Sequence, residues 1–376
     1  MSRVKLGDVA QEYKATVKDC SNLPIVGLEH LTPGEIALER WDEGTENTFT
    51  KGFKKGQMLF GRRRAYLKKA AVAPFDGVCS GDITVIEAIP GKILPELLPF
   101  IIQNDLLFDY AVGKSAGSLS PRVKWVDLKD YEFELPEIEK QTSLVDLLKA
   151  AHATRKAYQE QIKATDDLVK SQFIEMFGSP VTIDKKWPVM TVGDVSTSQL
   201  GKMLNAKNQT GKEQHLYLAN RNVQWFSFDL TDLRMMDFNE AEREKYKLEI
   251  DDLLVCEGGE IGRCAIWHGE IEDCYIQNAV HRVRCNRELI SPLFLGQLLY
   301  YHAQENGFSD IVGSKATIAH LPADKLKAMK IPVPPLHLQN EFEQIVKQSD
   351  KSKFELQQAI EKVDNLIKSL IQQDNN

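Results

Sequence analysis

The chain has 376 residues, of which 43% are hydrophobic and 27% charged, and its formal net charge is −7. This composition is ordinary for a folded protein of two or three domains, and it excludes collagen-like, disordered and disulfide-scaffold classes. No run of about 18 apolar residues occurs and the first residues form no apolar leader, so the sequence predicts a cytoplasmic protein without a membrane span. The acidic total gives no general attraction to nucleic acid, which leaves only local basic patches to bind it.

One stretch of the first half departs from the acidic average. Between residues 51 and 69 the chain carries eight basic side chains and no acidic one. Arginine is well shaped for bidentate contacts with guanine or phosphate, so we predict that this stretch contacts DNA; a solvated basic loop is the alternative. The predicted contact residues here are Lys51, Lys54, Lys55, Arg62, Arg63, Arg64, Lys68 and Lys69.

An internal repeat is the most informative feature of the sequence. Leu-Gly-Asp-Val at 6–9 returns as Val-Gly-Asp-Val at 192–195, and the Val-Gly pair at 112–113 returns at 312–313. Leu-Pro at 135–136 followed by Gln141 has its counterpart in Pro-Pro at 334–335 followed by Gln339. The markers keep their order, which predicts two copies of one unit.

Each copy ends in a long helical pattern, from about Glu139 to Phe177 and from about Leu338 to Ile371. Both patterns fit heptads, although in the first a neighbouring frame through Leu147 and Leu168 fits as well. A surface helix packed on its own domain is the alternative to an antiparallel coiled coil, which at about 1.5 Å per residue would be a rod of roughly 50 Å. The residues predicted to form the coiled-coil seam and to serve partner docking are Leu144, Leu148, Tyr158, Ile162, Val169, Phe342, Val346, Leu356, Ile360, Val363 and Ile367.

The remaining parts combine strand-like stretches, for example 82–86, 252–256 and 280–284, with short helical patterns. Strands do not alternate regularly with long helices, so we predict an α+β class and not a doubly wound sheet. The predicted domains are a first globular domain at 1–136, a spacer helix at 137–178, a second globular domain at 179–335 and a spacer helix at 336–376.

The second half offers a different set of polar groups. Its counterpart of the basic stretch reads Gly-Gly-Glu-Ile-Gly-Arg at 258–263, where glycine permits close approach of the backbone to a ligand. Each polar side chain alone is more typical of a solvated surface, but as a set they suit base edges and phosphates. The candidates are Asn220, Arg221, Asn222, Arg263, Gln277, Asn278, His281, Arg282, Arg284 and Lys315.

Catalytic and metal motifs are missing from the sequence. Thr-Gly-Lys-Glu at 210–213 lacks the upstream glycine and final hydroxyl of a phosphate-binding loop, and the single Pro-Pro, at 334–335, has no adenine-methyltransferase context. Four cysteines at 256, 264, 274 and 285 are spaced too widely for a zinc knuckle. We therefore predict no catalytic residue, no metal site and no cofactor on this chain.

The chain resembles the specificity (S) subunits of type I DNA restriction–modification enzymes over essentially its whole length. The resemblance rests on the two-fold repeat, on Asp-Leu-Leu-Val followed by Gly-Gly-Glu-Ile-Gly-Arg within 252–263, and on the proline-to-glutamine approach to each long helix. It implies two target recognition domains that each read one half of a bipartite DNA sequence, and a coiled-coil spacer that docks two modification subunits. Those subunits would use S-adenosylmethionine to methylate adenine, and two restriction subunits would use ATP and Mg²⁺ to translocate and cleave DNA.

Three other functions remain open from the sequence. The chain could be an S-like subunit of a different restriction or methylation-only system, which neighbouring genes would distinguish. It could be a coiled-coil adaptor with two protein-binding heads, against which the basic stretch argues. A stand-alone enzyme is the third, although no pairing of nucleophile and base is visible.

Overall fold

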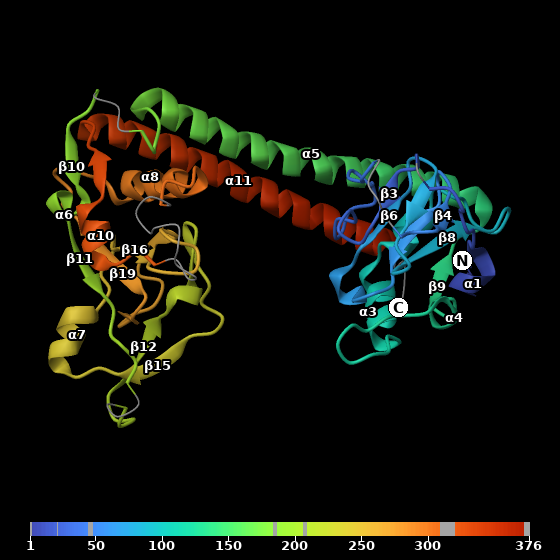
Figure 1. Cartoon of the computed structure of the whole chain (residues 1–376), viewed down its shortest axis with the longest axis horizontal. Coiled ribbons are helices and arrows are strands. Elements are labelled where there is room, and N and C mark those ends of the chain that lie inside the picture. Colours follow the sequence, from blue (N-terminus) through green and yellow to red (C-terminus); the bar gives the residue numbers. More distant parts are fainter. Residues whose placement is uncertain are drawn as a thin grey trace. The chain divides into compact units, whose positions relative to one another are not determined.

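A computed structural model describes residues 2–20, 22–43, 48–182, 186–205, 209–308 and 320–371. The chain divides into two compact units, each built from a globular part and one half of each long helix. Unit 1 comprises Met1–Glu160 and Leu356–Asn376, and unit 2 comprises Gln161–Glu355. The predicted division into separate globular and spacer segments therefore differs from the compact units, because both long helices (green and red in Figure 1) are shared.

Unit 1 is built on an antiparallel four-stranded sheet in the order β2-β8-β5-β6. A three-stranded sheet β3-β7-β4 and the pair β1-β9 complete it. The strands are β1 (Ser2–Lys5), β2 (Ala10–Glu12), β3 (Ile25–Val26), β4 (Lys51–Phe53), β5 (Met58–Gly61), β6 (Ala70–Val72), β7 (Gly77–Cys79), β8 (Ile83–Ala88) and β9 (Glu132–Leu135). The helices that end within this unit are α1 (Leu6–Val9), η1 (Ala65–Leu67), α2 (Leu98–Ile102), α3 (Asp105–Gly113) and α4 (Trp125–Leu128).

Unit 2 repeats this plan. Its four-stranded antiparallel sheet has the order β11-β19-β16-β17, beside the sheet β15-β12-β18 and the pairs β10-β20 and β13-β14. The strands are β10 (Val189–Thr191), β11 (Ser196–Leu200), β12 (Gln214–Leu218), β13 (Val223–Gln224), β14 (Ser227–Phe228), β15 (Arg234–Asp237), β16 (Leu253–Cys256), β17 (Cys264–Ile266), β18 (Tyr275–Ile276), β19 (Val280–Cys285) and β20 (Lys330–Pro332). The helices are α6 (Val192–Val195), η3 (Asn220–Asn222), α7 (Glu240–Tyr246), α8 (Pro292–Gln304) and α10 (Ala323–Ala328). The predicted repeat and the α+β class are confirmed.

The Gly-Asp motif of the repeat has a local physical cause. It forms α1 and α6, where Asp8 and Asp194 each accept a hydrogen bond from the backbone N–H three residues earlier, at 2.9 and 2.8 Å. A Cβ on Gly7 would lie 3.3 Å from the carbonyl oxygen of Lys129, and one on Gly193 would lie 3.2 Å from that of Lys327. Both glycines therefore allow the first turn to pack closely against the segment that leads into the last strand.

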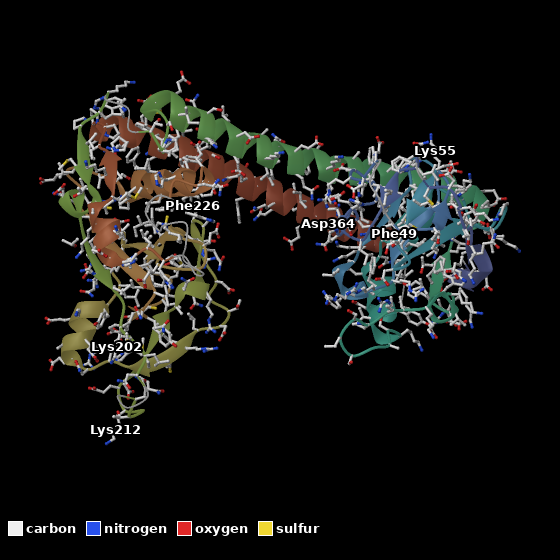
Figure 2. All side chains as sticks on the ribbon, viewed as in Figure 1. Phe49, Lys55, Lys202, Lys212, Phe226 and Asp364 are labelled. Carbon is white, nitrogen blue, oxygen red and sulfur yellow. The ribbon has the colours of Figure 1, made fainter. Side chains whose placement is uncertain are left out.

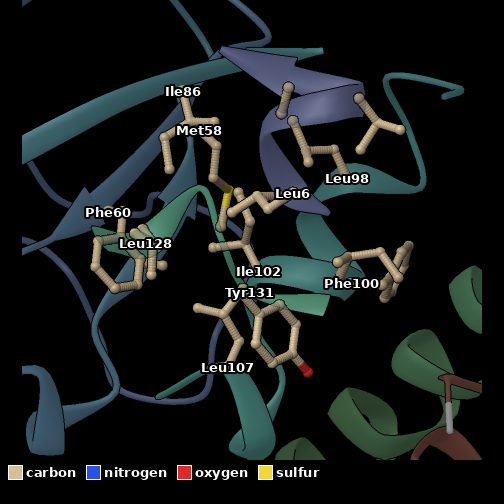
Figure 3. Close-up of a cluster of buried hydrophobic side chains, with 14 of the residues drawn as sticks. Leu6, Met58, Phe60, Ile86, Leu98, Phe100, Ile102, Leu107, Leu128 and Tyr131 are labelled. Carbon is tan, nitrogen blue, oxygen red and sulfur yellow. The ribbon is translucent and has the colours of Figure 1, made fainter. Parts of the chain in front are cut away.

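The main core of unit 1 lies between its four-stranded sheet and α2, α3 and α4. Figure 3 shows Leu6, Met58, Phe60 and Ile102 among the buried side chains that meet there. In unit 2 the equivalent core is rich in aromatic rings, and Phe173 of the long helix α5 (Ile138–Phe177) stacks on Phe294 of α8 at 5.8 Å. Each long helix is thus part of a globular core.

The two long helices, α5 and α11 (Leu336–Ile371), begin within two residues of their predicted starts. In unit 1 the fully buried Leu148 belongs to the cluster that Ile367 and Ile371 pack against, and in unit 2 Phe173 and Phe177 contact Phe342. The pairing is antiparallel in each unit taken alone. Leu147 and Leu168 are 46% and 58% exposed, so the neighbouring heptad frame is wrong.

The glutamine that follows each proline marker anchors its helix. Gln141 accepts a hydrogen bond from the Leu94 N–H and donates to the Pro136 carbonyl, at 2.8 and 2.9 Å. Gln339 does the same with Ser291 and Pro334, at 2.8 and 2.7 Å. Both amides are buried and both satisfy backbone groups, which explains why the same residue recurs in both copies.

Candidate nucleic-acid interface

Three connections of unit 1 meet at one end of its four-stranded sheet. They are the hairpin 62–69 between β5 and β6, the turn 80–82 before β8, and the segment 116–123 before α4; we call them the unit 1 loop cluster. Backbone hydrogen bonds join Arg62 N–H to the Asp82 carbonyl at 2.9 Å, Val123 N–H to the Arg62 carbonyl at 3.0 Å and Arg64 N–H to the Pro121 carbonyl at 2.8 Å. Backbone hydrogen bonds therefore join these arginine-rich loops to one another.

The predicted basic stretch does not form one patch. Lys54 and Lys55, the latter labelled in Figure 2, lie on the turn before β5, whereas Arg62, Arg63 and Arg64 follow the end of the same strand. A strand of four residues separates the two groups by roughly 13 Å. Residues that are close in sequence thus point their charges to opposite ends of the sheet.

The stretch 51–69 contains no acidic residue, but the fold brings aspartates from other parts of unit 1 close to its cations. Lys54 pairs with Asp76 at 2.8 Å, Lys68 with Asp105 at 2.6 Å and Arg63 with Asp82 at 3.4 Å. These contacts hold the pKa of each of the three aspartates below its usual value, chiefly through hydrogen bonds from Lys54 to Asp76, from Arg122 to Asp82 and from Lys68 to Asp105. The expectation of an uncompensated basic patch is therefore wrong for these cations.

Two other lysines of the stretch are also engaged. Lys51 donates to the Ile83 carbonyl at 2.9 Å and lies 3.6 Å from Glu12, and Lys69 donates to the Leu28 carbonyl at 2.7 Å. Lys55, Arg62 and Arg64 have no hydrogen-bonded or ion-paired side chain within the described ranges, and the Nε of Arg62 is buried without a partner. Arg64 is exposed and has a left-handed backbone with φ of 53°. Arg62 and Arg64 are the cations of this cluster best placed for an external anion.

Unit 2 has a corresponding loop cluster, formed by the hairpin 257–263, the helix η3 and the turn 277–279 before β19. Asn220 lies at its centre and donates to the Gly258 carbonyl at 2.8 Å. Arg263 donates to the backbone and side-chain oxygens of Asn220 at 2.9 and 3.0 Å. These two predicted contact residues bind each other and hold the glycine-rich hairpin in place.

Three predicted contact residues of unit 2 are buried, so we withdraw them from the contact set. Asn222 is 2% exposed and donates to the Asp229 carbonyl at 2.9 Å. His281 is 0% exposed with its Nε2 on the Leu321 carbonyl at 2.9 Å, and Arg282 is 9% exposed and donates to the Lys247 carbonyl at 2.6 Å. Burial lowers the pKa of both His281 and Arg282. These three side chains form hydrogen bonds with backbone carbonyls inside unit 2.

The other candidates of unit 2 vary in accessibility. Arg221 pairs with Asp232 at 2.9 Å, and Arg284 forms a bidentate pair with the buried Asp252. Gln277 and Asn278 are half-buried on the turn at the end of the sheet. Lys315 lies outside the described residues. Gln277 and Asn278 therefore remain the accessible base-edge candidates of this cluster.

Sequence reasoning missed Asp82 and Arg122. Arg122 donates from Nε and Nη2 to the two carboxylate oxygens of Asp82, at 2.6 and 3.2 Å. The only signal was positional, because Arg122 follows the first copy of the repeated Val-Gly marker at 112–113 and Asp82 is the first residue of the predicted strand 82–86. No sequence pattern near either residue indicated that the two side chains form an ion pair.

The predicted docking residues on the long helices are also used internally. Leu148, Val169, Phe342 and Val346 are buried in the cores of their own units, and the other seam residues are half-buried. The four buried residues are therefore not accessible to a partner, and docking on the half-buried ones stays a prediction. The exposed large apolar side chains in the described parts of the two helices are Ile138, Leu147, Leu168, Ile174, Phe354 and Leu366.

The described part of the chain holds no group of three or more His, Cys, Asp or Glu side chains suited to a metal ion. None of its helices, within the same ranges, has an apolar stretch long enough to cross a bilayer. Burial raises the pKa of Cys256 to about 11 and that of Cys274 to about 12, so both remain thiols near neutral pH.

Parts of the chain are similar to known proteins. Residues 184–363 match the family described as type I restriction modification DNA specificity domain. The chain is 25% identical over 193 residues to the putative type I restriction enzyme MjaX specificity subunit of Methanocaldococcus jannaschii, a match that covers 50% of this chain and 45% of the relative. It is 24% identical over 221 residues to the type I restriction enzyme EcoDI specificity subunit of Escherichia coli, covering 54% of this chain and 47% of the relative. The matches thus span about half the length of these curated relatives.

The fold has a counterpart among solved structures. A chain from a structure of a type I restriction–modification system matches 98% of this chain and 96% of its own length, with a TM-score of 0.61 and 19% sequence identity. That likeness concerns the fold, and it extends over both units. The second half of the chain thus matches the type I specificity domain, and the fold of the whole chain is similar to that of the solved chain.

Proposed function

We propose that this chain is the DNA-reading subunit of a type I restriction–modification complex and that it carries no catalytic group itself. Each unit reads one half of a bipartite target. The observation that carries the proposal is that two loops, a hairpin and the turn beside it, recur at the same end of the same four-stranded sheet in both units. Two copies of one binding platform fit a DNA target with two separate half-sites.

The two loop clusters differ in chemistry, so the two half-sites differ in sequence. Unit 1 offers Arg62 and Arg64, which suit phosphates and guanine edges. Unit 2 offers the amides of Gln277 and Asn278 beside a glycine-rich hairpin, and amides of this kind suit adenine edges. An asymmetric bipartite target follows from this difference.

The proposed docking of partner subunits is inferred from the surface of the two long helices. Two modification subunits dock on the exposed apolar side chains of the long helices, such as Leu147, Leu168 and Phe354, because exposed apolar groups on paired helices favour association. These subunits bring S-adenosylmethionine and methylate adenine. Two restriction subunits bring ATP and Mg²⁺, and the complex acts in the cytoplasm, where its DNA lies.

A methylation map tests this function directly. Adenine methylation is mapped by long-read sequencing in the host with and without this gene. Loss of methylation at one gapped, asymmetric motif is the expected result. Unchanged methylation, together with no DNA binding by the chain co-purified with its partners, would contradict the proposal and favour a protein-binding adaptor.

A further inference from the structure

Asp82 lies at the centre of the unit 1 loop cluster and binds two arginines from different loops. Arg122 holds both carboxylate oxygens, at 2.6 and 3.2 Å, and Arg63 approaches one of them at 3.4 Å. Arg63 also donates to the Ser120 hydroxyl at 3.1 Å. The Asp82 side chain is 19% exposed, whereas those of Arg63 and Arg122 are 38% and 40% exposed. Both guanidinium groups therefore keep an outward edge while their inner edges are held.

The charges of the cluster are only partly balanced. Hydrogen bonds from Arg122 lower the pKa of Asp82, so its carboxylate is ionised at neutral pH. The three loops carry four arginines; the carboxylate binds Arg63 and Arg122, whereas Arg62 and Arg64 have no side-chain partner within the described ranges. Asp82 thus fixes two of the four arginines and leaves the other two free.

Fixed and free arginines act differently on DNA. A free arginine binds any phosphate, with an affinity that falls as salt rises. An arginine whose guanidinium is already oriented loses less entropy when it forms a bidentate contact with a base edge, and such contacts carry sequence information. A carboxylate that orients two arginines also neutralises part of their charge. It thereby weakens their sequence-independent attraction to DNA phosphates.

We propose that Asp82 is a specificity-determining positioning residue for the half-site that unit 1 reads. It holds Arg63 and Arg122 as an oriented fork and keeps them from binding phosphates indiscriminately. This inference rests on the proposed function and extends it to a residue that does not itself contact DNA.

The variant Asp82→Asn keeps the shape of the side chain and removes its charge. Arg63 and Arg122 are then free to bind phosphates, so affinity for unrelated DNA rises and the slope of log affinity against log salt becomes steeper by about 1 to 2. Discrimination of the unit 1 half-site falls about ten-fold, since a bidentate base contact is worth about 1–3 kcal/mol. A merely structural role predicts weaker binding to all DNA and no steeper slope.

The experiment uses the complex assembled with its modification subunits. Binding is measured over a range of salt concentrations on a duplex with the methylation motif, on two duplexes with one half-site scrambled, and on an unrelated duplex. Asp76→Asn is the matched control, because it removes another ion-paired aspartate, beside Lys54, at the opposite end of β5. Asp82→Glu keeps the charge. It is therefore expected to discriminate the motif from unrelated DNA better than Asp82→Asn does.

The outcomes separate the two proposals. Loss of discrimination confined to one half-site, with a steeper slope on unrelated DNA, supports the role of Asp82. Wild-type discrimination and slope in Asp82→Asn would overturn it while leaving the proposed function intact. A wild-type complex that does not distinguish the motif from unrelated DNA would overturn both. Where Asp82→Asn does not assemble, Arg122→Gln serves instead, and unchanged discrimination by that variant overturns the inference.

Discussion

Arg155 and Lys353 occupy the same position in the two long helices, counted from Ile138 and Leu336, and each pairs with an aspartate of the other helix. In unit 1, Arg155 lies 3.6 Å from Asp364. In unit 2, Lys353 lies 2.9 Å from Asp166, which is the counterpart of Asp364. A charged residue at a core heptad position costs stability but specifies register and orientation. The repeated ion pair therefore favours one antiparallel register.

Reversing one of these charges tests the register role. Lys353→Glu places a third acid beside Asp166 and Asp350, which both bind Lys353 at 2.9 Å. Because the aspartates are exposed, we expect a loss of about 1 kcal/mol, or roughly 2 °C in Tm. Adding Asp166→Lys should recover about half of the loss, whereas Lys351→Glu, an exposed neighbour, should cost little. Thermal unfolding measures both, and equal losses at 351 and 353 would contradict the register role.

Only the unpaired arginines of unit 1 should govern the electrostatic part of DNA binding. Replacing Arg62 and Arg64 with alanine is expected to weaken binding by the assembled complex and flatten its salt slope by about 1 to 2. Lys54→Ala removes a cation that Asp76 already neutralises, so its slope should match the wild type. Fluorescence anisotropy at several salt concentrations distinguishes the variants. A flattened slope in Lys54→Ala alone would place the DNA at the other end of β5.

The features that the sequence predicted well are those carried by periodicity and repetition. The heptad pattern located both long helices, and the repeated Gly-Asp and Pro-to-Gln markers correspond to the same contacts in each unit. Each of these features depends on neighbours within a few residues, or on a packing site that both copies share. Local causes of this kind produce patterns that can be recognised in the sequence.

The candidate site was predicted less well, because its chemistry depends on residues far apart in sequence. Asp82 and Arg122 are 40 residues apart, and no local pattern indicates that they meet. His281 belongs to β19, which lies between β11 and β16 and is covered on its polar-looking side as well. His281 was therefore predicted as a contact residue from its polar side chain, although that side chain is buried.

The buried His281 should make the stability of unit 2 sensitive to acid. Burial lowers its pKa below the usual value near 6.5, so the unfolded chain binds the proton more readily than the folded one. Stability is then fully present above about pH 7 and is lost as the pH falls through the unfolded value. His281→Gln, which retains a donor for the Leu321 carbonyl, should show a flatter fall in Tm between pH 7 and 5.5, whereas the exposed His268→Gln should follow the wild type. Identical pH profiles for all three proteins would argue against this assignment.

Charges placed in the helix seam should disrupt the helix pair. Leu356 and Ile360 are half-buried at core heptad positions, and replacing both with aspartate buries two unpaired charges at a cost of at least about 3 kcal/mol. We expect loss of the paired helices and of co-purifying modification subunits. Gln357→Asp with Gln358→Asp adds the same charge on the exposed face and should leave assembly intact. Retention of the modification subunits by the seam variant would show that docking does not depend on the helix pair.

Helix length should set the unread gap between the two half-sites. Inserting seven residues after Ala157 of α5 and seven after Glu361 of α11 keeps both heptad frames and, because Arg155 faces Asp364, extends both helices at matching points. Seven residues add about 10 Å, which corresponds to about three base pairs of DNA. The methylated motif in cells that express this variant should therefore have a longer gap and unchanged half-sites. The same insertion in α5 alone shifts one helix past the other and should abolish methylation, since the pairs Arg155–Asp364 and Asp166–Lys353 can then no longer both form. A motif with its original gap in the doubly extended variant would mean that the spacing is set outside the helix pair.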